Sequence, residues 1–259
     1  MRSTARYTSL IVITLMLAGC GSGGGGFNLM SLEEEWQLGN QLSQEVARQV
    51  RINNDPAVNA YIRSMGERIV AQTPMARMPW QFHVVDDPAI NAFAIPGGHV
   101  YVNTGLINAT ANASELAGVM AHEITHGVSR HSTEQMSTQY GLSALASIVL
   151  GQNAGNIQQI AAQVIAGGAL ARFSRGAERE ADEQGIRYMA AAGYNPRGMA
   201  TMFQKLMDNE KRQPGTVEKF FSTHPLTTER VRDAEKRAAA MGQTGATDEP
   251  EFQRIKARI

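Results

Sequence analysis

The feature that most restricts the fold of this chain is a pair of histidines four residues apart, with a glutamate directly after the first. The run reads His122-Glu123-Ile124-Thr125-His126. Positions i and i+4 share one face of an α-helix, so both imidazoles can reach one metal ion while Glu123 points toward its water. The flanking residues are small or apolar, which indicates a buried helix. We therefore expect the fold to surround one buried, metal-binding helix.

The spacing of this run is typical of zinc metalloproteases. A catalytic zinc site has three protein ligands and keeps a fourth position for water. Zinc lowers the pKa of that water toward about 7, and Glu123 would accept its proton and deliver it to the leaving amine. The sequence thus predicts one zinc ion per chain, with His122 and His126 as two ligands and a third ligand from elsewhere.

Carboxylates further along the chain offer the third ligand. Glu178 and Asp182 lie one turn apart on an expected helix. One of them can bind the metal while the other orients a ligating histidine, a contact that fixes the tautomer of the imidazole. The spacing does not decide between them. Because His83, His99 and His131 lie outside helical register with the histidine pair, we expect none of them to bind the metal.

The pattern of residues 31–242 predicts one α+β domain that is mainly helical and contains a small sheet. Apolar periodicity and capping residues predict helices that begin near residues 31, 55 and 112, and helices over 178–192, 196–209 and 227–241. Alternating apolar residues between 80 and 103 predict strands that end in a hairpin. The low-charge residues 141–171 are expected to form a helical cover, and residues 243–259 a C-terminal tail.

Composition excludes several classes of protein. The 24 Lys and Arg residues balance 24 Asp and Glu residues, so the chain lacks the basic surface that nucleic acid requires. Its one cysteine cannot form an internal disulfide. The longest apolar stretch, residues 10–19, is shorter than the roughly 20 residues that a membrane-spanning helix needs. We therefore expect no nucleic-acid partner, no disulfide scaffold and no polytopic membrane protein.

Residues 1–19 have the order of a signal peptide, with Arg2 and Arg6 before an apolar centre and small residues. The four residues that end at Cys20 resemble the bacterial lipobox, in which the cysteine is acylated and begins the mature protein. This resemblance implies a lipid-anchored envelope protein and, because aspartate does not follow Cys20, one at the periplasmic face of the outer membrane. The glycine-rich residues 20–30 would then form a tether. The alternative is an ordinary cleaved signal in which Cys20 has no role.

Further motifs stand on both sides of the histidine pair. They are Asn91-Ala92-Phe93-Ala94, Pro96-Gly97-Gly98, Asn103-Thr104-Gly105-Leu106, Glu115-Leu116-Ala117, Glu178-Arg179-Glu180-Ala181-Asp182, and Thr223-His224-Pro225 with Arg230. Together these motifs cover residues 80–235. They resemble the zinc metallopeptidase family that includes the CaaX prenyl proteases, the heat-shock membrane protease HtpX, and the periplasmic proteins LoiP and BepA. Neither the transmembrane helices of the first two branches nor a tetratricopeptide extension is expected, so the small lipoprotein branch is the most similar.

The resemblance implies a zincin-like fold of the gluzincin type and a role for each residue of these motifs. In the acidic run it assigns Glu178 as a zinc ligand and Asp182 as a residue that contacts a zinc ligand rather than the ion. Glu180 is expected in solvent. The resemblance also places His224 near the metal. There His224 would be a fourth zinc ligand that holds the enzyme latent, or a donor to the oxyanion, with Arg230 supporting the same charge or pairing with an acid. A solvent-facing turn histidine is the third alternative.

Together these features predict a zinc-dependent endopeptidase of the bacterial envelope. An extended, unfolded polypeptide could add to the hairpin through backbone hydrogen bonds. The resemblance and the expected location imply misfolded or unassembled outer-membrane proteins as substrates and the outer-membrane assembly machinery as a partner. The alternative is an envelope chaperone that uses zinc as a latch, although a structural zinc site needs no glutamate beside the metal. The residues expected on the substrate-binding edge are Ile95, Gly97, Gly98, Val100 and Asn103.

Overall fold

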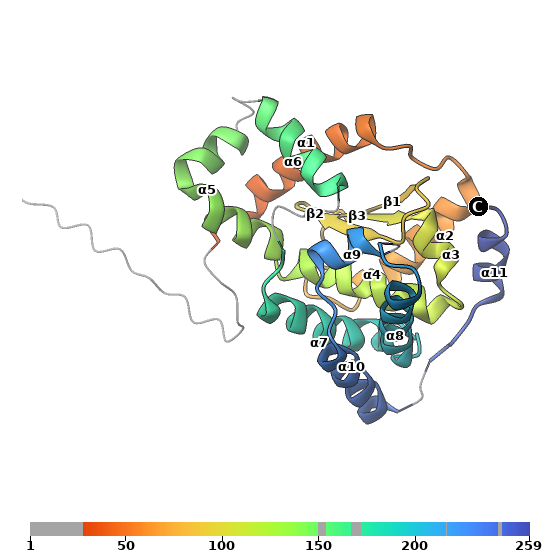
Figure 1. Cartoon of the computed structure of the whole chain (residues 1–259). Helices are drawn as coiled ribbons and strands as arrows, with labels where there is room; N and C mark the ends of the chain where they lie inside the picture. The colour runs from red at the N-terminus through yellow and green to blue at the C-terminus, as the bar shows by residue number, and fades with distance from the viewer. Residues whose placement is uncertain (1–27, 150–153, 167–171, 216, 243–244) are drawn as a thin grey trace, which may run out of the picture.

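In the computed structural model of this chain, helices surround a small three-stranded sheet, which confirms the predicted α+β class (Figure 1). The described residues are 28–149, 154–166, 172–215, 217–242 and 245–259. The strands are β1 (Gln81–Val85), β2 (Ala92–Ile95) and β3 (His99–Asn103). The helices are α1 (Leu32–Gln49), α2 (Pro56–Val70), α3 (Thr104–Ala109), α4 (Ala113–Val128), α5 (His131–Val149), α6 (Ala154–Ile165), α7 (Arg175–Ala191), α8 (Arg197–Arg212), α9 (Glu218–Thr223), α10 (Thr228–Met241) and α11 (Pro250–Lys256).

Local capping interactions start three helices where the sequence predicts them. Ser31 and Glu34 form a reciprocal capping box at the start of α1. Asp55 accepts hydrogen bonds from two backbone N–H groups of α2, whose first residue is proline. Asn112 accepts a hydrogen bond from the backbone of Glu115 at the start of α4. Because each cap satisfies N–H groups that the helix cannot, these boundaries follow from a few adjacent residues.

The sheet has the strand order β1-β3-β2, with β3 parallel to β1 and antiparallel to β2. The predicted hairpin is confirmed, since Gly97 and Gly98 join β2 to β3 with φ values of 80° and 76°. The expectation that Val100 and Asn103 lie on a free edge is wrong. Both belong to β3, which is paired on both sides, and within the described part of the chain the edge without a partner strand next to the hairpin is that of β2.

Two layers of helices cover the two faces of the sheet (Figure 1). Helices α2 and α4 pack against the face that carries Val84, Val100 and Val102. Helix α1, with α5 and α6 beyond it, covers the face that carries Tyr101, whose hydroxyl donates to Ser43 of α1. The hairpin turn is also covered, because a Cβ on Gly39 of α1 would lie 2.2 Å from the carbonyl oxygen of Pro96. Gly97 and Gly98 are therefore not a free docking edge.

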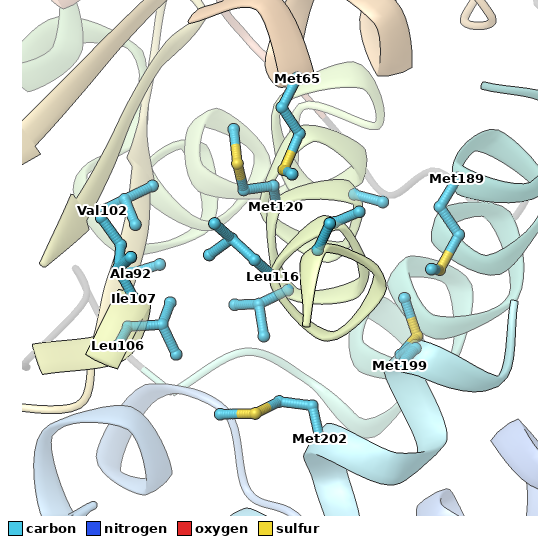
Figure 2. Packing of buried hydrophobic residues seen from close by; sticks show 14 of the residues in the cluster. Met65, Ala92, Val102, Leu106, Ile107, Leu116, Met120, Met189, Met199 and Met202 are labelled. Atoms are coloured by element: carbon cyan, nitrogen blue, oxygen red, sulfur yellow. The ribbon is translucent and has the colours of Figure 1, made fainter. Parts of the chain in front are cut away.

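Helix α4 lies at the centre of the larger core, and every residue from Ala113 to His126 is buried. A helix that is apolar on most sides requires neighbours all round. Leu116 and Met120 contribute its packing surface in Figure 2. The side chains drawn around them include Met65, Ala92, Val102, Leu106, Ile107, Met189, Met199 and Met202.

Two glycines allow other helices to approach α4 closely. A Cβ on Gly118 of α4 would lie 2.7 Å from the Cα of Met199 in α8. A Cβ on Gly185 of α7 would lie 3.2 Å from the carbonyl carbon of Ala121 in α4. The missing side chains therefore set the distance between α4 and the helices beside it, and α7 carries the predicted acidic motif.

The prediction of a C-terminal tail over residues 243–259 is wrong for residues 245–259. Phe252 and Ile255 of α11 are fully buried in the same core as α4. Asp248 accepts a hydrogen bond from the backbone N–H of Ala113, and Thr247 accepts one from Ser114. This segment therefore satisfies the first N–H groups of α4, a role that its short apolar pattern does not reveal.

The tether predicted for residues 20–30 also ends earlier than expected. Met30 is buried, and Leu29 donates a backbone hydrogen bond to Ser137 of α5. Residues 20–27 of the predicted tether, which include Cys20, and the predicted signal peptide lie outside the described residues. Among the helices of the described part of the chain, none is long and apolar enough to cross a membrane.

The predicted helical cover over 141–171 is confirmed for its described residues. Helix α5 is kinked at Gly141, where φ is 70°, and α6 packs against α1. Residues 150–153 and 167–171 lie outside the described part of the chain. The later helices α8 and α10 agree with the prediction to within three residues, whereas α7 begins at Arg175 because Ser174 caps it three residues ahead of the predicted start.

The close contact at Gly118 yields a prediction about stability. Gly118→Ala should lower the free energy of unfolding by about 1–3 kcal/mol, because its Cβ meets the backbone of Met199. Gly176→Ala on α7 is the matched control, because its Cβ would have only Ser174 Oγ nearby, at 3.6 Å, and should raise helix stability by about 0.5–1 kcal/mol. Urea unfolding measures both. Equal changes in the two variants would contradict this account of the packing.

Candidate metal centre

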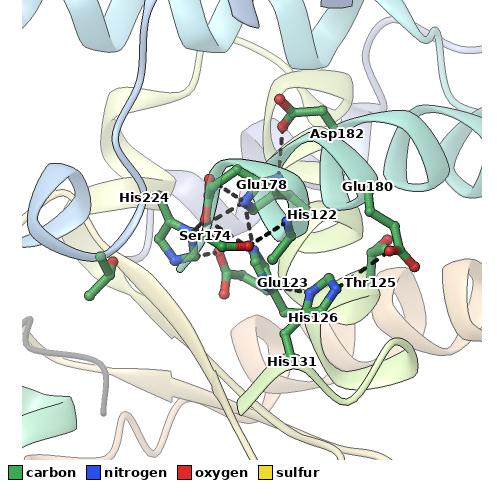
Figure 3. A network of polar contacts seen from close by, with 12 residues as sticks. His122, Glu123, Thr125, His126, His131, Ser174, Glu178, Glu180, Asp182 and His224 are labelled. Carbon is green, nitrogen blue, oxygen red and sulfur yellow. Dashed lines mark hydrogen bonds and ion pairs between the residues drawn. The ribbon is translucent and has the colours of Figure 1, made fainter. Parts of the chain in front are cut away.

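Four side chains that can bind a metal ion meet between α4, α7 and the residue after α9. They are His122, His126, Glu178 and His224, and each is at most 2% exposed. One ligand atom from each lies within 4.8 Å of the others. Figure 3 shows these side chains pointing toward one another from separate elements. The structure therefore brings together the predicted ligands from sequence positions up to 102 residues apart.

Several of the distances between these atoms are close to those between the ligands of a tetrahedral zinc site, although the set as a whole extends to 4.8 Å. The Nε2 atom of His122 lies 3.1 Å from His126 Nε2, 3.6 Å from Glu178 Oε2 and 3.2 Å from His224 Nδ1. His126 Nε2 lies 3.5 Å from Glu178 Oε1. Zinc–ligand bonds of 2.0–2.1 Å in a tetrahedron separate the ligand atoms by about 3.3 Å. A nitrogen and oxygen donor set with this spacing suits zinc.

The electrostatics of the cluster favour a bound cation. Burial by itself disfavours a charged His122, but its contacts with Asp182 and Glu178 outweigh burial and raise its pKa to about 9. Burial also opposes the charged form of Glu178, yet the neighbouring imidazoles, led by His224, hold its pKa well below the usual value. Glu178 is thus an anion among three imidazoles. A buried site that stabilises a proton in this way also attracts a metal cation.

Asp182 and Arg230 support the cluster from outside. Asp182 Oδ1 lies 3.0 Å from His122 Nδ1, the ring atom that faces away from the other ligands. Arg230 donates two hydrogen bonds to Asp182, of 2.7 and 2.8 Å, and its Nη1 lies 2.5 Å from Glu178 Oε2. It also donates to the carbonyl of Pro225. Of the two roles considered for Arg230, this geometry favours pairing with acids.

Glu123 lies beside the cluster with one oxygen free. Its Oε1 has no hydrogen-bond partner among the described residues and lies 3.4 Å from His224 Nε2. Burial raises the pKa of Glu123, although the nearby imidazoles and the Ala94 amide oppose part of that increase. Glu123 also lines a cleft. Side chains and backbone that line this cleft include Asn91, Phe93, Ala94, Ile95, Val164, Phe173 and Thr223.

Of the other predicted residues, His83 and His99 lie on the sheet, away from the cluster. Their ring nitrogens are 3.2 Å apart, and His83 stacks on Tyr101. Burial lowers the pKa of each histidine to about 4. Both are therefore neutral residues of the fold, in agreement with the sequence analysis.

Sequence reasoning missed two residues behind His126. Phe173 stacks on the His126 ring with centroids 4.0 Å apart, and no sequence pattern marks it. His131 Nδ1 lies 2.9 Å from His126 Nδ1. Glu180, which we expected in solvent, accepts a hydrogen bond from Ser129 and lies 3.7 Å from His131. The Glu180 side chain is 34% exposed, so it does reach solvent, but the turn after α4 also brings Ser129 and His131 into contact with it.

Comparison with known proteins identifies the family of this chain. Residues 56–238 match peptidase family M48. The chain is 32% identical over 239 residues to the beta-barrel assembly-enhancing protease of Yersinia pestis, a match that covers 89% of this chain and 49% of that protein. Its counterpart in Escherichia coli K12 is 32% identical over 238 residues, with 88% and 49% covered.

A mitochondrial relative gives a similar match. The mitochondrial metalloendopeptidase OMA1 of Schizosaccharomyces pombe is 33% identical over 218 residues, which are 81% of this chain and 63% of that protein. The chain thus spans about half the length of the bacterial relatives. These matches confirm the resemblance inferred from the motifs, and the chain belongs to peptidase family M48, a family of zinc metallopeptidases.

Proposed function

We propose that this chain is a zinc-dependent endopeptidase in which His122, His126 and Glu178 hold zinc and Glu123 is the general base. The observation that carries the proposal is the meeting of four buried ligand atoms beside the free carboxylate oxygen of Glu123. When bound, zinc would lower the pKa of its water toward about 7 and polarise the scissile carbonyl. Glu123 would accept a proton from the attacking water molecule and would deliver it to the leaving amine.

The surroundings of Glu123 suit this role. Burial raises its pKa, so the carboxyl group can hold a proton between the two steps and release it again. Asp182 faces His122 Nδ1 and thereby leaves Nε2 free for the metal. Arg230 forms ion pairs with Glu178 and Asp182, and these contacts offset part of the cost of burying two carboxylates.

His224 acts as a latch in this proposal. Its Nδ1 lies 3.2 Å from His122 Nε2 and 3.0 Å from Glu178 Oε1, where a fourth ligand would stand. A fourth protein ligand occupies the position that water needs, so the enzyme is latent until His224 moves away. The alternative role as an oxyanion donor requires the same ring to leave the cluster. The position of Arg230 supports the latch, because its donors are directed to acids and to the Pro225 carbonyl.

We propose that the substrate is an extended polypeptide that pairs with the unpaired edge of β2. Two features support this: Phe93 and Ile95 of β2 line the same cleft as Glu123, and the outer edge of β2 has no partner strand among the described residues. Val164 of α6 also lines this cleft. Backbone pairing selects unfolded chains with little regard to their sequence. Helix α6 would have to move for a chain to enter.

The natural substrates we propose are misfolded or unassembled outer-membrane proteins, with the outer-membrane assembly machinery as a partner. The names of the bacterial relatives, which describe proteases that enhance beta-barrel assembly, support this. We further propose that residues 1–19 are removed, that Cys20 is lipidated, and that the protein stands at the periplasmic face of the outer membrane. The second candidate function is an envelope chaperone with zinc as a latch, which the fourth ligand position of His224 favours.

Glu123→Gln tests the catalytic proposal. It should lower hydrolysis of a denatured protein by about 10²–10⁴-fold, because it removes the general base and leaves the zinc ligands intact. Zinc content should stay at one ion per chain, whereas Glu178→Ala should lose both metal and activity. Glu183→Gln is the control, since this glutamate of α7 pairs only with Arg187 and Arg237 among the described residues. Normal turnover of zinc-loaded Glu123→Gln would refute the assignment.

His224→Ala separates the latch from the oxyanion role. As a latch, His224 restrains the enzyme, so its removal should raise or preserve basal proteolysis while zinc stays bound. An oxyanion donor predicts a loss of about 10²–10³-fold instead. Hydrolysis of a denatured protein, with and without a chelator, gives the rates. If neither wild type nor His224→Ala cleaves under any of these conditions, the chaperone proposal replaces the endopeptidase.

Cys20→Ser tests the lipid anchor in the full-length protein. Without the thiol no acyl group can be attached, so the protein should leave the membrane fraction or stay as an unprocessed precursor. Cell fractionation with a radiolabelled fatty acid measures label and location together. Wild-type protein that carries no label, or a mature Cys20→Ser protein that stays in the membrane fraction, would contradict the proposal.

A further inference from the structure

His126 contacts a second imidazole on the side of its ring that faces away from the predicted ion. His131 Nδ1 lies 2.9 Å from His126 Nδ1, and the two rings meet edge to face at 70°. Both residues are buried, with His131 6% exposed. Because His126 Nε2 points into the cluster, His131 cannot be a ligand of the same ion. It touches the metal ligand only from behind.

The chemistry of an imidazole determines how this contact must be polarised. A hydrogen bond between two ring nitrogens needs one N–H and one lone pair. If His126 binds a metal through Nε2, its proton must lie on Nδ1, so His126 donates and His131 Nδ1 accepts. The proton of His131 then lies on Nε2. That atom faces Glu180 Oε2 at 3.7 Å, an electrostatic contact longer than a hydrogen bond.

Glu180 is itself held in place. Its other oxygen, Oε1, accepts a hydrogen bond of 2.7 Å from Ser129 Oγ. The series Glu180, His131, His126 thus runs from the partly exposed side of α7 to the metal centre (Figure 3). With a metal on His126 Nε2, each histidine of the series would direct its N–H toward Glu180. On the other histidine ligand, His122, the carboxylate of Asp182 contacts Nδ1 with no second imidazole between them. The two histidines of α4 therefore have different outer partners.

The backbone turn that positions His131 is strained, and contacts with α1 and the residues before it hold the turn in place. Arg130 has a φ of 58°, a left-handed conformation that is uncommon for residues other than glycine. Its side chain donates to Glu35 of α1 at 2.6 Å and to the carbonyl of Met30 at 2.5 Å. Glu35 is 3% exposed and also accepts from Thr133 of α5. Such a conformation persists only where its surroundings hold it, which points to a functional position.

We propose that His131 is a positioning residue of the metal centre. As the acceptor for His126 Nδ1–H, it holds His126 in the orientation and tautomer that leave Nε2 free for zinc, and Glu180 holds His131 in the matching tautomer. The proposal rests on the proposed zinc site and extends it. It also gives the first part of the chain, Met30 and Glu35, an indirect role at the metal through Arg130.

Two substitutions at one position separate a hydrogen-bonding role from a packing role. His131→Phe keeps an aromatic ring beside Phe173 but removes the acceptor. His131→Asn removes the ring, while its Oδ1 can stand near the position of Nδ1. If His131 acts as the acceptor, zinc affinity should fall about 10–100-fold in His131→Phe and should stay within about threefold of wild type in His131→Asn. Competition with a chromogenic chelator measures the affinity. If His131 acts only by packing, zinc affinity should fall more in His131→Asn than in His131→Phe. That result would overturn the proposal.

The glutamate contact has its own comparison on the same helix. Glu180→Ala should weaken zinc binding, by less than His131→Phe, because it frees the tautomer of His131 without removing the acceptor. Glu183→Ala, which removes a neighbouring glutamate of α7 that forms surface pairs, should leave the affinity unchanged. Equal affinities in the two alanine variants would remove Glu180 from the proposal.

Nuclear magnetic resonance of the zinc-loaded wild type tests the proposal without any substitution. Histidine labelled with ¹⁵N should show coupling between His126 Nδ1 and His131 Nδ1 across the hydrogen bond, with the proton on His126. Absence of this coupling, or a proton on His131 Nδ1, would overturn the inference even if the variants fail to fold. If wild-type protein does not bind zinc at all, the proposed function fails instead, so the two failures are distinguishable.

Discussion

The constraint on which the rest of the structure depends is the burial of polar groups on α4. This helix has no exposed face through the metal-binding run, yet it carries two imidazoles and a carboxylate. Buried polar groups are costly unless other polar groups or a metal satisfy them. Neighbouring elements meet most of that requirement, with Asp182 beside His122, His131 beside His126 and His224 beside Glu178, while Glu123 Oε1 has no hydrogen-bond partner among the described residues.

This requirement explains the arrangement of the helices around α4. Helix α7 must approach closely enough for its carboxylates to reach the imidazoles, and Gly185 provides the space. The segment after α9 must return to the same point, and Arg230 holds it there through the Pro225 carbonyl and the acids of α7. On the opposite side, α1 fixes the turn between α4 and α5 through Glu35 and Arg130. Packing and electrostatics therefore act at the same contacts.

The same arrangement limits access to Glu123. The cleft beside it is lined by residues of the edge strand β2 and by Val164 of α6, and α6 belongs to the second, smaller core with α1 and α5. The layer formed by α1, α5 and α6 packs mainly on itself. It can therefore move with a smaller loss of packing free energy than the core around α4. The proposed entry of an extended chain and the proposed departure of His224 would both take place at this boundary. A protease that acts on unfolded chains benefits from such a barrier, because folded proteins cannot open it.

Much of this architecture could be predicted from the sequence because it follows from interactions within a few residues. Capping at Ser31, Asp55 and Asn112 gave three helix starts, and the hairpin followed from adjacent glycines. The histidine run indicated a metal site because positions four apart share a helix face. Helical spacing could not show whether Glu178 or Asp182 is the third ligand, because it relates residues within one helix and the histidines lie on another. That choice needed the resemblance to known proteins.

Tertiary structure alone decided the contacts between elements. The burial of Phe252 and Ile255, the central place of β3, and the contact of His131 with His126 each join parts of the chain whose mutual direction no local pattern encodes. His131 shows the reason most clearly. It lies five positions after His126 in the sequence, a spacing that would place the two side chains on different faces of a continuous helix. The left-handed turn at Arg130, held by a glutamate from α1, ends that helix and brings the two rings together.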